Sequence, residues 1–190
     1  MRLIVGITGA SGAIFGVRTL EALRALDVES HLILSRWARV TIAQETSYTV
    51  EQVERLASFF YKQENQAAPV SSGSFRTDGM IVAPCSMKTL AAIRAGFGDT
   101  LICRAADVIL KERRRLVLLA RESPLSQIHL ENMLALARMG VTIFPPVPAF
   151  YNRPQTVEAV VDYIVGRALD QFSLEMPAMP RWNGLDAQVR

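Results

Sequence analysis

The sequence predicts an α/β fold of the Rossmann-like, doubly wound type, a three-layer fold with helices on both faces of a mostly parallel sheet. Apolar runs of strand length alternate with longer helical patterns along the chain. Most of the apolar runs stop abruptly at glycine, serine or proline. No internal repeat or linker interrupts the alternation. We therefore expect one domain over residues 1–172 and an irregular tail over 173–190.

The first strand and its turn carry the clearest signal for a ligand. The run from Arg2 to Ile7 indicates a buried strand, Gly9 and Gly12 indicate a tight turn, and a helical pattern extends from Ile14 to Leu26. Glycines let backbone N–H groups approach a ligand closely, because they have no Cβ. The start of a helix adds unsatisfied donors and a partial positive charge, which favour a phosphate.

The spacing of this turn excludes the common dinucleotide and triphosphate motifs. The glycines fall at Gly9, Gly12 and Gly16 instead of in Gly-x-Gly-x-x-Gly, and no Gly-Lys-Ser/Thr follows. Ser35 stands about where a nicotinamide enzyme carries an acidic residue for the ribose. A mononucleotide phosphate or a phosphorylated substrate is the favoured ligand. The alternative is tight helix–strand packing with no ligand at all.

The later elements are predicted from apolar runs, caps and stops. Further strands are expected at residues 29–34, 79–83, 115–119 and 141–144, because each is a short apolar run bounded by turn residues. Helices are expected at 36–45, 50–57, 87–95, 101–112, 126–139 and 157–172. Thr49, Thr100 and Thr156 are suited to cap three of them. Residues 59–69 have weak periodicity, which predicts a loop or a short helix.

Composition excludes several classes of protein. The 190 residues are 50% hydrophobic and 21% charged, with a formal net charge of +3. No basic stripe interleaved with aromatics suggests nucleic acid, and no apolar stretch reaches the ~18 residues of a membrane helix. Cys85 and Cys103 form no CxxC motif, so a reducing, cytoplasmic location is expected. His31 and His129 lack metal-ligand spacing, and no metal site is expected.

Residues at the strand ends are the candidates for function, because ligands of doubly wound sheets bind beyond the carboxyl ends of the strands. The set is rich in hydroxyls and cations, and comprises Thr8–Ser11, Ser35, Pro84–Thr89, Arg121–Glu122 and Pro148–Tyr151. Plainer interpretations remain for several groups. Ser86 and Thr89 can be simple helix caps, and Arg121 with Glu122 can be a local ion pair. On a neighbouring helix, Arg104 and Lys111 can belong to a salt-bridged surface.

Eight blocks in a fixed order resemble a known family. They are Thr8–Ala13, Ser72–Ser74, Pro84–Leu90, Arg104–Val108, Leu110–Arg114, Arg121–Leu125, Ile128–Met133 and Pro148–Tyr151. Together they closely resemble the UbiX/Pad-type flavin prenyltransferases, from Arg2 to about Trp182. The resemblance implies a flavoprotein fold of the HFCD type for residues 1–172, with the tail 173–190 as a lid or subunit contact.

The resemblance also implies a reaction. Such enzymes join a dimethylallyl group from dimethylallyl monophosphate to N5 and C6 of reduced FMN, without a metal, and phosphate leaves. The product, prenylated FMN, serves a separate UbiD-type decarboxylase. Members assemble as homododecamers, so residues of one chain can serve a neighbouring subunit's site. The sequence leaves open which decarboxylase and pathway use the product, whether dimethylallyl diphosphate is accepted, and whether Glu122 or the phosphate takes the C6 proton.

Roles carry over to matching residues. The FMN contacts implied by the resemblance are Gly9, Ala10, Ser11, Ser35, Ser86, Met87, Lys88, Thr89 and Arg121. The groups implied for the donor are Arg104, Lys111, Tyr151, Arg167 and Trp182. The groups implied for catalysis are Ser11, Glu45, Glu122 and Lys111.

Three other functions compete with this hypothesis. The first is an FMN-dependent decarboxylase that acts directly on an aromatic acid. The second is a cysteine-type decarboxylase of the same superfamily, which would need a catalytic histidine and an Asn-rich turn where this chain has Pro84–Thr89. The third is a flavin carrier without catalysis.

Overall fold

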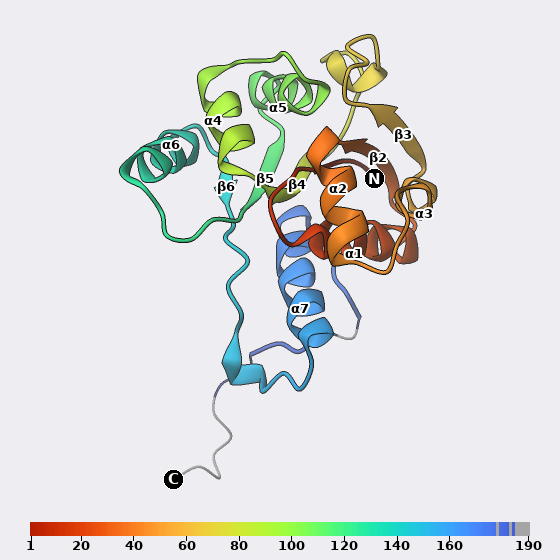
Figure 1. Cartoon of the computed structure of the whole chain (residues 1–190), viewed down its shortest axis with the longest axis vertical. Helices are drawn as coiled ribbons and strands as arrows, with labels where there is room; N and C mark the ends of the chain where they lie inside the picture. Colours follow the sequence, from red (N-terminus) through yellow and green to blue (C-terminus); the bar gives the residue numbers. More distant parts are fainter. Residues whose placement is uncertain (178, 183, 185–190) are drawn as a thin grey trace.

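A computed structural model of the chain describes residues 1–177, 179–182 and 184 (Figure 1). Its centre is a six-stranded sheet in the order β3-β2-β1-β4-β5-β6, in which all neighbouring strands pair in parallel. The strands are β1 (Arg2–Ile7), β2 (Glu29–Leu34), β3 (Phe59–Lys62), β4 (Gly79–Cys85), β5 (Arg115–Ala120) and β6 (Thr142–Ile143). This order is that of a doubly wound fold, as the sequence predicts, and β1 and β4 lie side by side where the order reverses.

Helices cover both faces of the sheet (Figure 1). They are α1 (Ala13–Ala25), α2 (Arg36–Glu45), α3 (Val50–Leu56), α4 (Met87–Ala95), α5 (Leu101–Lys111), α6 (Gln127–Arg138) and α7 (Val157–Leu169). Three short 3₁₀ helices are added, η1 (Pro69–Ser71), η2 (Phe150–Asn152) and η3 (Asp170–Phe172). In the described part of the chain, none of the helices has the length and apolarity that a membrane crossing requires.

The core lies in two layers because successive strand residues point to opposite faces of the sheet. Leu3, Val5 and Ile7 of β1 belong to the cluster that α1 and α7 cover. Ile4, between them in sequence, belongs to the cluster under α4 and α5. Burial on both faces explains why the central strands are apolar throughout instead of alternating.

The prediction for residues 59–69 is wrong in its first part. Phe59–Lys62 is a strand, β3, that pairs in parallel with β2, with His31 opposite Phe59. Ser30 and Ser58 reinforce its start, since each backbone N–H donates to the other's hydroxyl at 3.1 Å. A four-residue strand at the sheet edge is partly exposed on both faces, so its side chains show no alternation. The sheet therefore has six strands where five were expected.

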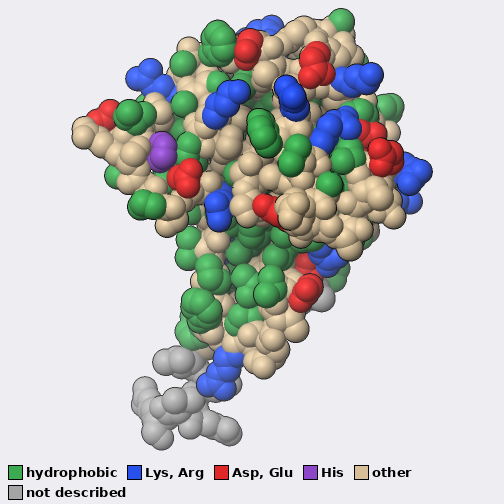
Figure 2. All heavy atoms as spheres, viewed as in Figure 1, with side chains coloured by type: hydrophobic (Ala, Val, Ile, Leu, Met, Phe, Trp, Pro, Cys, Tyr) green, Lys and Arg blue, Asp and Glu red, His purple; other side chains and the backbone are tan. Residues whose placement is uncertain are grey.

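After β6 the chain leaves the sheet, passes through η2 and returns to the sheet as α7. Residues 144–156, α7 and the described residues that follow η3 form what we call the arm, which occupies the lower part of Figure 1. Hydrophobic side chains gather on its surface in Figure 2, and exposed ones include Val147, Phe150 and Val157. The final helix is shorter than predicted, because α7 ends at Leu169 and η3 completes the stretch to Phe172.

Candidate functional site

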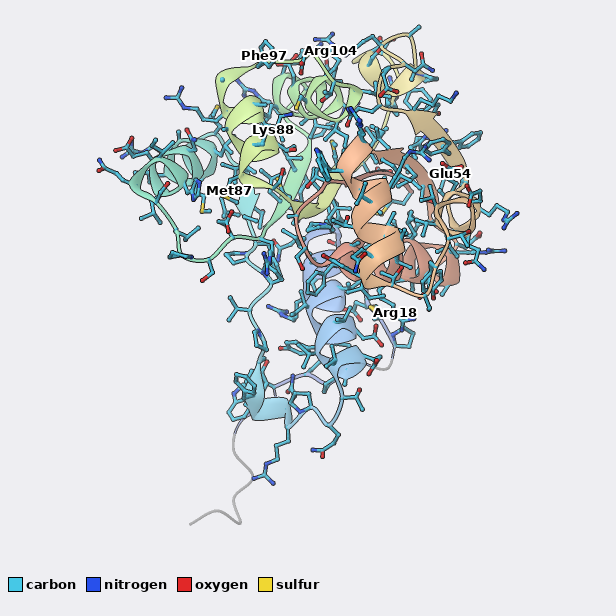
Figure 3. All side chains as sticks on the ribbon, in the orientation of Figure 1. Arg18, Glu54, Met87, Lys88, Phe97 and Arg104 are labelled. Atoms are coloured by element: carbon cyan, nitrogen blue, oxygen red, sulfur yellow. The ribbon has the colours of Figure 1, made fainter. Side chains whose placement is uncertain are left out.

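A cavity of about 480 Å³ opens at the carboxyl edge of the sheet. It lies between the starts of α2, α4 and α5, the helices that follow β2, β4 and the α4–α5 loop. Figure 3 shows Lys88 on α4 and Phe97 in the loop after it. The residues that line it are Thr8, Gly9, Ser35, Arg36, Trp37, Gln63, Ser86, Lys88, Thr89, Ala92, Phe97, Asp99, Thr100, Ile102 and Cys103.

Thr8 joins the two strands at the floor of this cavity. Its hydroxyl donates to the Pro84 carbonyl at 2.7 Å and accepts from the Ser86 N–H at 2.9 Å. The Thr8 side chain is buried, so both of its hydrogen bonds are shielded from water. The ends of β1 and β4 are thereby held in a fixed relation.

Two helix N-termini meet in the cavity. Ser35 caps α2 by accepting from the Ala38 N–H at 3.0 Å, and Ser86 caps α4 by accepting from the Thr89 N–H at 3.3 Å. The plain interpretation of Ser86 as a cap is thus confirmed, and both serines also line the cavity. Free N–H groups, the helix dipoles and the nearby Lys88 make this end of the cavity suited to a phosphate.

The turn between β1 and α1 was expected to bind a phosphate, but in the structure a side chain of the same chain lies at the start of α1. Gly12, at φ 99°, begins α1 without a side-chain cap of its own. Glu45, from the end of α2, supplies the missing acceptor, because its Oε2 accepts from the N–H groups of Gly12 at 2.7 Å and Ala13 at 3.1 Å. A carboxylate of the same chain therefore occupies the anion position at the start of α1.

Gly9 serves close packing at this turn. A Cβ placed on Gly9 would lie 2.2 Å from the Cβ of Trp37, so only glycine lets α2 approach. Trp37 and Phe97 are more than half exposed at the cavity, and Ile102 and Cys103 add apolar surface. Sequence reasoning missed this wall, because the α4–α5 loop follows a helix and not a strand end.

The cysteines are poor nucleophiles here. Burial raises the pKa of the Cys85 thiol far above its ordinary value. Burial also raises the pKa of Cys103, which lines the cavity. Both thiols are free of disulfides and stay protonated near neutral pH.

Several predicted flavin residues lie near the cavity without lining it. Ser11 is exposed on the first turn, next to Ala10. The Met87 side chain is buried in the core, so only its backbone can face a ligand. Arg121 and Glu122 are exposed beyond β5, where the Arg121 N–H donates to the Cys85 carbonyl at 3.1 Å.

The residues predicted for the donor fall into two groups that one chain does not bring together. Arg104, on α5, donates to the Ser71 carbonyl at 3.1 Å and pairs with Asp107 at 2.8 Å. Lys111, at the end of the same helix, pairs with Glu112 at 2.7 Å, so the salt-bridged surface is confirmed. The second group lies on the arm, whose helix α7 covers the face of the sheet opposite to α5 (Figure 1).

Aromatic contacts define the group on the arm. The Tyr151 hydroxyl is hydrogen-bonded to that of Tyr163, and its ring meets Trp182 edge-on with centroids 5.3 Å apart. The hydrogen bond to Tyr163 raises the pKa of Tyr151, which keeps the phenol protonated. Arg167, on α7, pairs with Asp170 at 2.7 Å.

The residues present fit a flavin mononucleotide. The N-termini of α2 and α4, together with Lys88 and Thr89, suit its phosphate. Hydroxyl and amide groups of the cavity suit its ribityl chain, and the apolar wall of Trp37 and Phe97 suits a flat ring. In the described residues, no group of three or more His, Cys, Asp or Glu side chains is placed to hold a metal ion.

A doubly wound sheet with such a cavity at its switch point defines a nucleotide-binding α/β protein of the mononucleotide type. The model of the Flavoprotein family matches residues 1–169. A probable UbiX-like flavin prenyltransferase from Bacillus subtilis (strain 168) is 62% identical over 99% of this chain and 92% of its own length. The chain therefore belongs to the Flavoprotein family and, within it, to the UbiX-like flavin prenyltransferases.

Two solved structures agree with this assignment. The structure described as a dodecameric FMN-dependent UbiX-like decarboxylase from Escherichia coli O157:H7 is 62% identical, with a TM-score of 0.96 over 97% of this chain and 100% of its own. AnUbiX (PadA1), described in complex with FMN and dimethylallyl pyrophosphate, is 58% identical, with a TM-score of 0.96 over 97% and 98% of the two chains.

Proposed function

We propose that this chain transfers a dimethylallyl group from dimethylallyl monophosphate to N5 and C6 of reduced FMN, giving prenylated FMN for a UbiD-type decarboxylase. The observation that carries the proposal is the cavity with two capped helix starts and an aromatic wall, in a chain 58% identical to one described with FMN and dimethylallyl pyrophosphate. A cytoplasmic location is part of the proposal, supported by the two free cysteines.

The FMN would be held mainly from α2 and α4. Ser35, Ser86, Lys88 and Thr89 line the cavity. They would bind the phosphate and the ribityl hydroxyls. The backbone at Gly9, Ala10, Ser11 and Met87, together with Arg121, completes the set that we assign to the cofactor. When bound in its reduced form, FMN supplies the nucleophilic nitrogen and carbon that accept the five-carbon group. The chain's part is to hold that ring still and exclude water.

The donor would be bound by cations and a phenol. Arg104, Lys111 and Arg167 match the charge of its phosphate, and the Tyr151 hydroxyl can donate to a phosphate oxygen. These groups stabilise the phosphate as it leaves, so we propose that no metal is needed. Trp182 offers an aromatic surface for the prenyl group.

A neighbouring copy would complete this site. Tyr151, Arg167 and Trp182 belong to the arm (Figure 1) and do not line the chain's own cavity, and the arm exposes apolar side chains. A homologue 62% identical is described as dodecameric. We therefore propose a homododecamer in which the arm of one copy reaches the cavity of the next.

Three polar groups are assigned to proton handling near the reacting edge. Glu45 orders the first turn through Gly12 and Ala13 and so fixes Ser11 beside it. Glu122 is exposed beyond β5 and can accept the proton released at C6, as can the departing phosphate. Full turnover by Glu122→Gln would assign the proton to the phosphate. Turnover that stops at attachment to N5 alone would assign it to Glu122.

One experiment tests the function directly. Anaerobic incubation of the protein with reduced FMN and dimethylallyl monophosphate, followed by mass spectrometry of the released flavin, should show FMN heavier by one five-carbon unit. A chelator should leave the yield unchanged. Recovery of unmodified FMN alone would contradict the proposal.

Direct decarboxylation of an aromatic acid is the second candidate. It is favoured by the description of the Escherichia coli O157:H7 structure as a decarboxylase. Incubating the FMN-loaded protein with a hydroxybenzoate, without any second enzyme, separates the two functions. Release of carbon dioxide would support the alternative, whereas its absence alongside prenylated FMN would support the transferase.

A further inference from the structure

Asp170 accepts hydrogen bonds from two arginines at the end of α7. Arg167 Nη1 donates to its Oδ2 at 2.7 Å, and Arg181 donates to both carboxylate oxygens at 2.9 and 2.8 Å. The Asp170 side chain is only 14% exposed, while those of the two arginines are 45% and 42% exposed. A bidentate guanidinium–carboxylate pair fixes the orientation of both side chains as well as the distance between them.

The position of this aspartate needs an explanation. Asp170 follows the last residue of α7, where the helix dipole disfavours a negative charge. Its charge is instead offset by Arg167 from the preceding turn and by Arg181 from the C-terminal segment. The pair with Arg181 joins parts of the chain that are not neighbours in sequence, so it contributes to tertiary structure and not to the helix.

The residues beside Asp170 form a fixed platform. Phe172 is buried, and a Cβ on Gly79 of β4 would lie 2.7 Å from its ring. The Arg115 guanidinium donates to the Gln171 carbonyl, and the Leu174 N–H returns to the Leu169 carbonyl at 3.3 Å. The backbone beside Asp170 is therefore held against the sheet, which gives its carboxylate a fixed base.

A second anchor lies one turn back on α7. Gly166 has no side chain, and a Cβ there would lie 2.4 Å from the Met179 sulfur and 3.2 Å from the Met176 sulfur. The two methionines pack into this notch and fix the described residues before Arg181. The C-terminal segment is thus attached to α7 at two points. The methionines at Gly166 form an apolar contact, and Arg181 forms an ion pair with Asp170 at the end of the helix.

These anchors determine where Trp182 lies. It follows Arg181 directly and meets the Tyr151 ring at 5.3 Å and 75°. Tyr151 is also tied to Tyr163 of α7 through its hydroxyl. Without the Asp170 carboxylate, the attachment next to Trp182 is lost and Arg167 loses its partner.

We infer that Asp170 is a positioning residue for the donor side of the reaction. It docks the C-terminal segment through Arg181, which places Trp182 on Tyr151, and it orients Arg167. This inference rests on the proposed function, because those three residues are the ones assigned to dimethylallyl monophosphate on the arm.

Two variants test the inference with two kinds of measurement. The chain has two tryptophans, so the Trp37→Phe background makes Trp182 the single reporter. In that background, Asp170→Asn and Arg181→Gln should raise the nanosecond motion of Trp182 in time-resolved anisotropy by about twofold. With Trp37 intact, both should raise KM for dimethylallyl monophosphate about tenfold, with kcat and the Kd for FMN changed less than about threefold.

Conservative and matched controls accompany them. Asp170→Glu keeps the carboxylate and should restore a KM near that of the wild type. Glu54→Gln removes a carboxylate from the Arg39–Glu54 pair between α2 and α3 (Figure 3) and should change neither measurement. Because Arg181→Gln leaves the pair of Arg167 and Asp170 intact, it separates docking of the segment from orientation of Arg167.

The outcomes are decisive in each direction. Unchanged Trp182 motion in both variants would overturn the docking, and increased motion with an unchanged KM would overturn the positioning role. If the wild type forms no prenylated flavin, the proposed function fails while the anisotropy still decides the docking.

Discussion

At the scale of single residues, the cavity distinguishes side chains that bind a ligand from those that hold the chain in place. Lys88 is exposed at the start of α4 and lines the cavity with Thr89. Its ammonium group should strengthen the binding of a ligand that carries negative charge at this end of the cavity. A comparison of FMN with riboflavin, which has no phosphate, isolates this contribution.

We therefore expect Lys88→Met to weaken FMN binding by about tenfold, the magnitude of one charge-assisted hydrogen bond. Riboflavin binding should be unchanged, as measured by quenching of flavin fluorescence. Lys62→Met, at the end of β3 and outside this cavity, is the matched control and should alter neither ligand. Equal losses for FMN and riboflavin would place Lys88 away from the phosphate.

Glu45 stabilises the N-terminus of α1, independently of any role in catalysis. Its carboxylate is the acceptor for two N–H groups that α1 would otherwise leave without a partner. We expect Glu45→Gln to lower the free energy of unfolding by about 1 kcal/mol, because the amide keeps an acceptor but loses the charge at the helix start. Urea unfolding measures this change.

Glu131→Gln in the middle of exposed α6 is the control for Glu45. Its carboxylate accepts a hydrogen bond from the Gln127 side chain on the same helix, at 2.7 Å. Equal stability changes in the two variants would show that Glu45 makes no special contribution to α1.

At the scale of elements, a buried histidine links β2 to the edge strand β3. His31 lies with Nε2 2.8 Å from Glu29 and Nδ1 2.9 Å from the Tyr61 hydroxyl, and its ring stacks on Phe59 at 4.9 Å. Burial lowers the pKa of His31 below its ordinary value of 6.5, against the opposite effect of Glu29. The neutral ring is therefore the form that the fold accepts.

Stability should consequently depend on pH through this residue. Below about pH 6.5 the unfolded chain binds a proton at His31 more readily than the folded chain, so the free energy of unfolding falls as the pH falls. We expect a smaller loss between about pH 7 and about pH 5 in His31→Gln than in the wild type, from urea titrations at each pH.

His129→Gln provides the control, since the chain has two histidines. His129 is only partly buried and completes a capping box with Ser126. Glutamine can make the same pair of bonds. It should therefore preserve the full pH dependence, and an equally flattened slope in both variants would remove His31 as its cause.

The elements also show what the sequence could predict. β1, β2, β4 and their turns were predicted because deep burial leaves long apolar runs. β3 was missed because Phe59 and Tyr61 pack around His31 at an edge that no periodicity reveals. The wall from Phe97 to Cys103 was missed for another reason. It follows a helix, and the rule that ligands lie beyond strand ends does not reach it.

At the scale of the whole molecule, the residues predicted for the functional site lie in three places: the cavity, the surface of α5 and the arm. The sequence identified the hydroxyls at the starts of α2 and α4 correctly as cavity residues. It could not show that Arg104 lies against η1 while Tyr151 lies on the arm, because those positions depend on where the chain leaves the sheet after β6. The separation of these groups makes assembly the test of the complete site.

The arm provides surface for such an assembly. Val147, Phe150 and Val157 are 70%, 74% and 74% exposed, and α6 exposes Ile128. Apolar side chains grouped in this way favour contact with another protein surface. We expect Phe150→Asp to reduce the mass of the assembly in analytical ultracentrifugation, whereas Phe150→Leu keeps the apolar contact and should keep the mass. An unchanged mass for Phe150→Asp would exclude this surface from the interface.

A shared site makes a sharper prediction. If each cavity uses the arm of a neighbouring copy, Lys88→Met damages only the cavity and Arg167→Gln damages only the arm. Each variant alone should lose most activity at limiting substrate. Dissociating and reassembling a one-to-one mixture should create intact sites wherever a wild-type cavity meets a wild-type arm, about a quarter of the total for a head-to-tail contact. Prenylated FMN formed by the mixture, above the sum of the separate variants, measures this complementation. A mixture no more active than its components would mean that each chain completes its own site, and the arm would then have to fold back onto the cavity of the same copy.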